Sequence, residues 1–388
     1  MGCCGSANEI VKSPIVQPTE KVDPKMIRVV HYLTGYFCPA RSGIEVAVNN
    51  FMQMTAGQTQ NYVFTKNAIA KYPNGMRGAP SSSRVDRDYD ASTHERLWAL
   101  KPDLVIVYEC EDGNSDQDLM RVFYGKEAGS YGKIARLQFG HRIAPKFMQA
   151  ADQIWCFDEQ VVADIHPKFY EKIHLFPRVF DSAIFHDKVR LDTDPARPKL
   201  AYVGRIETRK RVMDLIRATL TIAETHDIHL TIVGGGTPKE LAVPVIDAAM
   251  KSNSVISYRG FKSQEHAAEV MRRSDIVVIP STRESFCSVA LEALACGCRV
   301  VNNTDQDCGL SRWIGGMSYN GYETRLVDQA GVPTYAALLK TMRHAINDLG
   351  KLPHDVHNMI QDYEISKVAF KVQKAITPWT GFVLEDPA

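Results

Sequence analysis

Short, almost continuously apolar runs alternate with helix-like stretches along this chain, and they do so in two series. The first series contains MIRVVHYLT (26–34) and DLVIVYE (103–109), and the second contains LAYVGRI (200–206) and DIVVIPS (275–281). Strands of this kind are buried on both faces, as in parallel sheets that helices cover. The pattern therefore predicts an α/β fold with two Rossmann-like halves and a cleft between them.

A polar, proline-bearing stretch, His186–Lys199, separates the two series and is interpreted as a linker between domains. Two domains also fit the length of 388 residues, since one domain commonly holds about 100–200 residues. The predicted divisions are a flexible tail at 1–25, a first Rossmann-like half at 26–185, a linker at 186–199, a second Rossmann-like half at 200–365, and a C-terminal helix at 366–388 that packs back on the first half.

The composition is that of an ordinary globular protein, with 45% hydrophobic and 23% charged residues and a formal net charge of +1. No apolar run approaches the about 18 residues of a membrane span, and no secretory signal is evident at the start. The nine cysteines lack the paired spacing of a zinc site, so we expect free thiols and a cytoplasmic protein. The start MGCCGS matches a short N-myristoylation pattern, but an unmodified flexible tail is the favoured interpretation.

The turn after the first strand of the second half, GRIETRKR (204–211), is rich in cations. Arg205 and Lys210 follow the carboxyl end of the strand, and Gly204 allows close approach of the backbone. Guanidinium and ammonium groups suit phosphate oxygens. Positive charge at the start of a helix opposes the helix dipole unless an anion is bound there, so we predict an anion site at this turn.

Two further turns of the second half contain glycine. Gly234 and Gly235 lie in IVGGG, which is either a tight turn or a place where a ligand approaches the backbone. The run YRGF follows the next predicted strand and contains Arg259, Gly260 and Phe261. The GxGxxG fingerprint of dinucleotide-binding proteins is absent.

Two carboxylates, Glu284 and Glu292, occur in the run ESFCSVALE. The preceding strand ends near Pro280, so Glu284 lies in a turn, and a helix is predicted to begin about Phe286–Ser288. The free N–H groups at the start of a helix bind anions. We expect these groups to face the cleft, and Glu292, about two helical turns further on, to reach a ribose.

The first half offers fewer candidates. Gly43 follows Ser42 in a small turn that enters a helix, and His141 ends a predicted strand, where a functional role competes with a structural one. Asp-x-Asp triplets can bind a divalent metal with a nucleotide. None clearly follows a strand, so we interpret them as solvated acids; they begin at Asp86, Asp88, Asp192 and Asp305.

Together these motifs resemble those of the GT-B glycosyltransferases of the large retaining family 4, over most of the chain. GRIETRK resembles the G-R-x4-K stretch of that family, ESFCSVALE its E-x7-E motif, and IVGGG and YRGF its next strand ends. FPRVFDSAIF resembles the P-x-G-V-D-x3-F segment that closes the first domain. The chain departs from the family at Arg211 and Ser285, where glycine is usual, and at Arg178–Val179, where Asn-Gly is usual.

The resemblance implies a metal-independent enzyme without a cofactor. It would move a sugar from a nucleoside-diphosphate sugar, with UDP favoured, to a hydroxyl acceptor and retain the α-anomeric configuration. The second half would bind the donor and the first half the acceptor. The implied catalytic residues are Arg205, Lys210, Glu284 and His141. The implied donor-binding residues are Gly43, Gly204, Gly234, Gly235, Arg259, Gly260, Phe261, Ser285, Phe286, Cys287, Ser288 and Glu292.

The motifs do not identify the acceptor. A glycan, a lipid or a small molecule is favoured, and the loop 67–90 is a candidate wall for it. A looser likeness to phage α-glucosyltransferases makes a hydroxymethylated DNA base the alternative acceptor. A non-catalytic nucleotide-sugar or glycan-binding protein is the alternative from another functional class.

Overall fold

The structure is a computed structural model. It describes residues 26–37, 43–68, 84–86, 93–108, 117–136, 145–157, 159–188, 194, 196–236, 242–252, 254–282, 284, 287–303, 321–324, 335–349 and 360–380. The predicted tail at 1–25 and most of the predicted acceptor wall at 67–90 lie outside these residues.

The first half of the chain forms a parallel sheet. Its strands are β1 (Ile27–Phe37), β2 (Thr59–Ala68), β3 (Arg84–Asp86), β4 (Leu104–Tyr108), β5 (Gly132–Arg136), β6 (Gln153–Cys156) and β7 (Ile173–Leu175). Their order across the sheet is β3-β2-β1-β4-β5-β6-β7, and neighbouring strands are parallel. Every residue of β4 is buried, as expected of a strand covered on both faces.

The second half forms a parallel sheet of the same kind. Its strands are β8 (Lys199–Val203), β9 (His229–Val233), β10 (Ile256–Gly260), β11 (Ile276–Ile279), β12 (Arg299–Asn303) and β13 (Gly321–Thr324). Their order is β10-β9-β8-β11-β12-β13. The first strand in sequence, β8, therefore lies beside the fourth, β11, and the strand order reverses between them.

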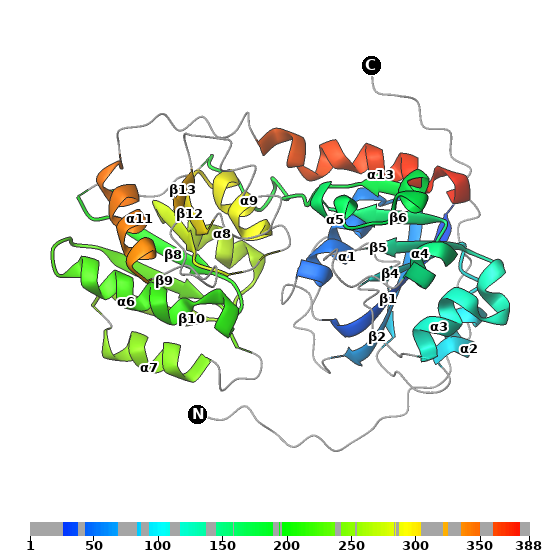
Figure 1. Ribbon diagram of the computed structural model, residues 1–388, viewed down its shortest axis with the longest axis horizontal. Helices are drawn as coiled ribbons and strands as arrows, with labels where there is room; N and C mark the ends of the chain where they lie inside the picture. Colours follow the sequence, from blue (N-terminus) through cyan, green and yellow to red (C-terminus); the bar gives the residue numbers. More distant parts are fainter. Residues whose placement is uncertain are drawn as a thin grey trace.

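Helices flank both sheets, which lie in two separate bodies in Figure 1. The α-helices are α1 (Gly43–Met54), α2 (Thr93–Ala99), α3 (Gln117–Tyr124), α4 (Pro145–Ala150), α5 (Glu159–Ala163), α6 (Val212–Ala223), α7 (Val243–Lys251), α8 (Gln264–Arg272), α9 (Ser288–Ala295), α11 (Tyr335–Asn347) and α13 (Ile365–Thr380). Short 3-10 helices are η1 (Lys126–Gly129), η3 (Pro167–Lys172), η4 (Thr208–Lys210) and η6 (Gln361–Tyr363).

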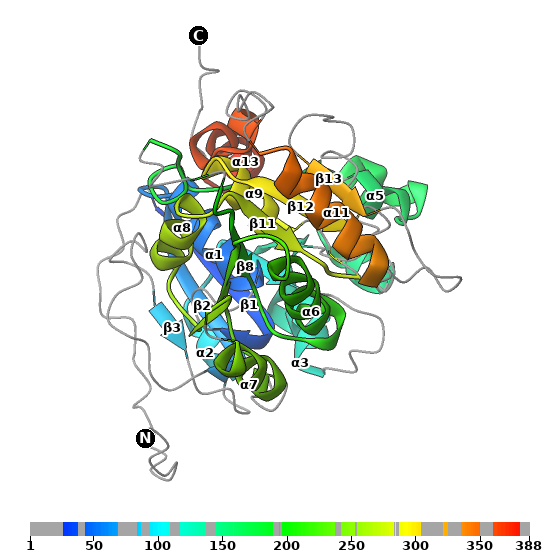
Figure 2. The ribbon, with the colours of Figure 1, turned by 90° about the vertical axis from the view of Figure 1, so that its left-hand side faces the viewer.

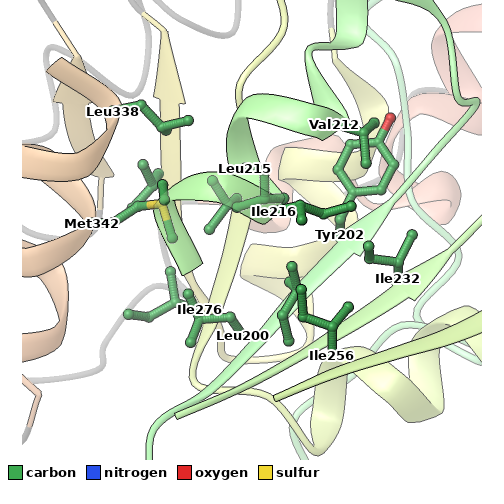
Figure 3. Packing of buried hydrophobic residues seen from close by; sticks show 14 of the residues in the cluster. Leu200, Tyr202, Val212, Leu215, Ile216, Ile232, Ile256, Ile276, Leu338 and Met342 are labelled. Carbon is green, nitrogen blue, oxygen red and sulfur yellow. The ribbon is translucent and has the colours of Figure 1, made fainter. Parts of the chain in front are cut away.

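Apolar clusters cover both faces of the second sheet. Figure 3 shows one of them, in which Leu215 and Ile216 of α6 and Met342 of α11 pack with the strand residues Leu200 and Ile276. Residues of α8 and α9 belong to the cluster on the other face. In Figure 2, α6 and α11 lie on one side of the strands and α8 on the other. Because the faces are covered, a ligand approaches this sheet at the ends of its strands.

The last helix, α13, lies against the first half although it follows the second half in sequence (Figure 1). Its residues Val372 and Ile376 belong to one apolar cluster with Val29 and Phe51 of the first half. The Gln373 amide donates a hydrogen bond to the Met54 carbonyl oxygen at 2.6 Å. The chain therefore passes twice between the halves.

The two passing segments pair with each other. Phe180 and Glu364 form a parallel β-bridge. The Ile365 N–H donates to the Phe180 carbonyl oxygen at 3.0 Å, and the Phe180 N–H donates to the Tyr363 carbonyl oxygen at 3.1 Å. The Ser182 hydroxyl adds a hydrogen bond of 3.0 Å to the Glu364 carboxylate. Backbone hydrogen bonds thus join the two connections between the halves.

The predicted α/β architecture with two parallel sheets is confirmed. Helix α7 begins at Val243 and has Pro244 in its first turn, where the missing N–H of proline is tolerated. In the described part of the chain, no helix is both long enough and apolar enough to cross a membrane.

Candidate functional site

The carboxyl ends of β8 and β11 mark the point where the strand order of the second sheet reverses. The connections leave in opposite directions at such a point, and the crevice between them is where parallel α/β sheets bind ligands. The turn after β8 spans 204–211, and the turn after β11 leads through Glu284 to α9. The Thr282 N–H donates to the Arg209 carbonyl oxygen at 2.8 Å, which ties the two turns together.

Charged side chains form a continuous series of ion pairs across these two turns. Arg205 Nη1 lies 2.7 Å from Glu207 Oε1, and Arg209 Nε lies 2.8 Å from Glu207 Oε2. Arg209 Nη1 lies 3.8 Å from Glu284 Oε2, and the Lys210 ammonium contacts Glu284 Oε1. We call this series, Arg205–Glu207–Arg209–Glu284–Lys210, the ion-pair chain. Its two ends are the cations that the sequence predicts to bind phosphate.

The arginines of the ion-pair chain are more exposed than its carboxylates. The side chains of Arg205 and Arg209 are 46% and 34% exposed, whereas those of Glu207 and Glu284 are 18% and 10% exposed. Three cations against two carboxylates leave one positive charge in excess. This edge of the second sheet therefore offers positive groups to an anion, with the carboxylates further from solvent.

Tyr202 supports the first turn from the core. It is buried, and its hydroxyl donates to the Arg205 carbonyl oxygen at 2.6 Å. Burial, followed by the nearby carboxylates of Glu284 and Glu207, raises the pKa of Tyr202 well above its usual value. The phenol therefore stays in the neutral form that this hydrogen bond requires.

Arg211 ends the cationic turn in a left-handed conformation, with a φ of 51°. This is a position at which the family that the motifs resemble usually has glycine, the residue best suited to positive φ. The guanidinium of Arg211 is held on α6, where its Nε lies 2.6 Å from Asp214 Oδ2. Arg211 is thus paired with Asp214 and is not a member of the ion-pair chain.

Glycines close the ends of β8, β9 and β10. Gly204 and Gly234 have φ angles of 153° and 151°, and a Cβ atom at Gly234 would lie 1.8 Å from the Gly204 carbonyl oxygen. The Gly204 N–H donates to the Val233 carbonyl oxygen at 3.0 Å, and the Gly234 N–H donates to the Gly260 carbonyl oxygen at 2.9 Å. Close approach of two turns therefore accounts for glycine at position 234.

The other predicted donor contacts are spread around the same edge and the first half. The Gly235 carbonyl oxygen accepts a hydrogen bond from the Ile206 N–H at 2.9 Å. Arg259 is exposed on β10, and Phe261, just after that strand, is 44% exposed. Gly43 is the first residue of α1. Three predicted site residues lie outside the described residues: His141, Ser285 and Phe286.

The helix after the second turn begins at Ser288, within the predicted interval. Cys287 precedes it in a left-handed conformation, with φ 62° and ψ 65°, and its side chain makes no capping hydrogen bond. Its carbonyl oxygen accepts the Ala290 N–H at 3.0 Å. The Cys287 thiol therefore does not occupy the N–H groups of the first helical turn, which point out of the helix toward its start.

Glu292 is buried in α9, with 8% of the residue exposed. Desolvation raises the pKa of its carboxyl to about 8, and the charge of Arg178 opposes that shift. Arg178 belongs to the segment between the halves and is itself buried, with its guanidinium 3.9 Å from the centre of the Phe157 ring. The Glu292 carboxylate has no hydrogen bond or ion pair among the described side chains. A buried acid with a shifted pKa, and with no direct partner in the described part of the chain, is typical of a ligand-binding position.

The sequence predicts no role for Glu207 or Arg178, and Arg209 is predicted only to add to the positive field of the cationic turn. The spacing of Glu207, two residues from both Arg205 and Arg209, is a local signal that would have found the first contacts. For Arg178 the sequence gives a weaker signal: arginine stands at a position where the family that the motifs resemble has asparagine.

Within the described residues, no three His, Cys, Asp or Glu side chains are grouped as metal ligands would be. The expectation that no Asp-x-Asp triplet follows a strand is wrong for one of them, because Asp86 is the last residue of β3. Its partner Asp88 lies outside the described residues, as do the triplets that begin at Asp192 and Asp305.

Comparisons with known proteins relate parts of this chain to glycosyltransferases. Residues 184–316 match the family described as Glycosyl transferases group 1. Over 118 residues, which are 29% of this chain and 26% of the relative, the sequence is 36% identical to the D-inositol 3-phosphate glycosyltransferase of Mycolicibacterium gilvum (strain PYR-GCK). The matching segment thus covers 26%, about a quarter, of the length of the first curated relatives.

Solved structures resemble 91% of the chain at low sequence identity. The sucrose-phosphate synthase of Thermosynechococcus elongatus gives a TM-score of 0.66 at 16% identity, covering 91% of this chain and 99% of that one. HepE of Anabaena, in complex with UDP and glucose, gives 0.66 at 13% identity, covering 91% and 100%. At such identities the likeness concerns the fold. The chain therefore has the GT-B fold, and residues 184–316 of its second half match the glycosyl transferases group 1 family.

Proposed function

We propose that this protein is a glycosyltransferase that moves a sugar from a nucleoside-diphosphate sugar to a hydroxyl acceptor. The observation that carries the proposal is the ion-pair chain at the reversal of strand order, with Arg205 and Lys210 at its ends. When the bond from the sugar C1 to the diphosphate oxygen breaks, the electron pair stays on the diphosphate. Fixed cations stabilise that charge without reorganisation.

The carboxylates have separate proposed roles. Glu284, held between Arg209 and Lys210, accepts hydrogen bonds from the hydroxyls of the transferred sugar. Glu292 accepts the ribose hydroxyls, a role supported by its burial and its lack of a direct partner among the described side chains. N–H groups at Ser285–Ser288 bind the diphosphate. His141 and Gly43 complete the site from the first half when the cleft closes.

In the proposed reaction the acceptor hydroxyl loses its proton to the departing diphosphate, and its oxygen bonds to C1. The α-configuration of the donor is retained, as in the retaining family that the motifs resemble. The two cationic side chains take the place that a divalent metal has in other glycosyltransferases, so the reaction is metal-independent. UDP is the proposed nucleotide, with support from HepE of Anabaena, which was solved with UDP and glucose.

The acceptor is proposed to be a hydroxyl of a glycan, a lipid or a small molecule. The family match begins at residue 184 and does not extend over the first half, which would bind the acceptor. Curated relatives of the second half are named for D-inositol 3-phosphate, so this compound belongs in an acceptor panel. A hydroxymethylcytosine-containing duplex belongs there as well, to test the likeness to phage DNA-modifying enzymes.

A donor panel tests the proposed function. The protein is incubated with UDP-glucose, UDP-galactose, GDP-mannose and ADP-glucose, with and without each acceptor, and released nucleoside diphosphate is measured. Turnover of one donor, lost in Arg205→Ala, is the expected result. If no donor is turned over and calorimetry detects no UDP or GDP binding, the protein is not a nucleotide-sugar transferase. Binding without turnover would favour the non-catalytic alternative.

A further inference from the structure

We infer that Glu207 and Arg209 are positioning residues of the donor site: Glu207 holds Arg205 in place, and Arg209 links Glu207 to Glu284. The inference rests on the proposed function, because it assigns the interior of the ion-pair chain to the orientation of groups that contact the donor. The G-R-x4-K motif specifies neither residue, because both lie at its x positions in the turn IETRK, and neither is part of the E-x7-E motif.

Glu207 has the position of a helix cap but does not act as one. It is the residue before η4, with an extended backbone at φ −139° and ψ 157°, and its side chain makes no capping hydrogen bond. An acid in this position ordinarily accepts a backbone N–H of the helix. Here one carboxylate oxygen contacts Arg205 and the other contacts Arg209. Both oxygens of the Glu207 carboxylate are thus paired with guanidinium groups.

The backbone on both sides of this carboxylate is fixed. The Ile206 N–H donates to the Gly235 carbonyl oxygen at 2.9 Å, and the Glu207 carbonyl oxygen accepts the Lys210 N–H at 2.9 Å. Two guanidinium groups in close proximity repel each other unless an anion lies between them. Glu207, whose side chain is only 18% exposed, supplies this anion from the protein side, and the Arg205 side chain beside it is 46% exposed.

Arg209 continues the connection into the second turn. Its side chain reaches Glu284 Oε2, while its carbonyl oxygen accepts hydrogen bonds from the Thr282 N–H at 2.8 Å and the Thr282 hydroxyl at 3.3 Å. Glu284 consequently has a cation on each oxygen, Arg209 on one and Lys210 on the other. A carboxylate held on both oxygens presents one fixed geometry to a sugar hydroxyl.

The test uses Glu207→Gln, which keeps the shape of the side chain and removes its charge. We expect kcat/KM to fall roughly tenfold to a hundredfold, the range in which loss of an orienting partner commonly lies. Asp214→Asn is the matched control, since it neutralises the carboxylate of the neighbouring Arg211–Asp214 pair outside the ion-pair chain. That control should stay within about twofold of the parent protein. Glu207→Asp should recover part of the loss.

A double-mutant cycle distinguishes positioning from general stability. If Glu207 acts through Arg205, adding Glu207→Gln to Arg205→Ala should cause no further loss of UDP affinity or of rate. An equal loss in both backgrounds, or equal behaviour of Glu207→Gln and Asp214→Asn, would overturn the inference. If Glu207→Gln lowers the melting temperature enough to impair folding, a second cycle takes its place. It combines Arg209→Gln with Glu284→Gln, and Arg209→Gln should cause no further loss of rate in the Glu284→Gln background.

The two proposals fail separately. If the parent protein turns over a donor and Glu207→Gln is unchanged, only the positioning inference is wrong. If no donor is turned over, the proposed function fails, and binding of inorganic pyrophosphate by calorimetry still decides the inference. Pyrophosphate requires only the cations, so its affinity should fall in Glu207→Gln and stay constant in Asp214→Asn.

Discussion

Lys210 and Glu284 are separated by 74 positions in the sequence and pair their side chains across two neighbouring strand ends. Lys210 follows β8 and Glu284 follows β11, the two strands between which the order of the second sheet reverses. Both side chains are largely buried, at 15% and 10% exposure. The pair is therefore fixed at the place where α/β sheets bind ligands.

Removing either end of the ion-pair chain should impair rate far more than stability. Arg205→Ala and Lys210→Ala each remove a positioned charge, which commonly lowers transition-state stabilisation by about 2–4 kcal/mol. Arg205 is 46% exposed, so its loss leaves no cavity in the core. Initial rates with the active donor, beside thermal unfolding of each variant, check this expectation. Normal turnover by both variants would show that the donor diphosphate binds elsewhere.

The position of the site follows from the sequence more directly than its electrostatics. Near-continuous apolar strands such as IVVI predict buried parallel strands, and parallel α/β sheets bind ligands where strands end. The cations after β8 and the acid after β11 could be assigned to one edge on this basis. The contact between these cations and this acid could not be predicted from the sequence. It depends on β8 and β11 being neighbours in the sheet, and only the strand order decides that.

The sequence did not predict that carboxylates of the protein itself, Glu207 and Glu284, pair with the cations of the turn. Cations at the start of a helix suggested a bound anion, and Glu207 and Glu284 supply internal anions to the same cations. The burial of Glu292 did have a signal. The run SVALEALA contains only apolar residues apart from Ser288 at its start and Glu292, and a helix that is apolar all round is buried.

The pKa of Glu292 predicts a pH dependence of stability. The folded protein holds this carboxyl protonated up to a pKa of about 8, whereas its ordinary value is 4.5. Between these values the folded state binds more protons than the unfolded state, so the free energy of unfolding falls as the pH rises. The stabilisation is complete below the ordinary pKa and is gone above the folded one.

Glu292→Gln should remove this decrease in the free energy of unfolding between low and high pH, which is on the order of a few kcal/mol. Urea unfolding of the parent and the variant at about pH 5 and about pH 9 measures it. Glu269→Gln on α8 is the control, because the Glu269 side chain is 46% exposed and has little desolvation to lose. Arg178→Met should raise the pKa of Glu292 further, since Arg178 is the charge that lowers it. An identical pH dependence in Glu292→Gln and the parent would contradict the burial of an acid with a raised pKa at this position.

Two neighbouring glycines should respond very differently to alanine. A Cβ atom at Gly234 would lie 1.8 Å from the Gly204 backbone oxygen, whereas one at Gly235 meets only Phe261 Cβ at 3.8 Å. Gly234→Ala should therefore destabilise the second half by about 3 kcal/mol or more. Gly235→Ala should remain within about 1 kcal/mol of the parent. Equal unfolding midpoints for the two variants would show that the strand ends are not in close contact.

Cys287 provides a chemical reporter of donor binding. Among the cysteines of the described residues, Cys156, Cys296 and Cys298 are buried and Cys287 is partly exposed. It lies directly before α9, whose first N–H groups are proposed to bind the diphosphate, so bound UDP should block reagents that reach its thiol. Alkylation with iodoacetamide, followed by peptide mass spectrometry, should show modification at Cys287 that slows in proportion to the fraction of protein bound to UDP. Adenosine, which lacks the diphosphate, is the control ligand and should protect far less. Undiminished alkylation at saturating UDP would place the diphosphate away from the start of α9.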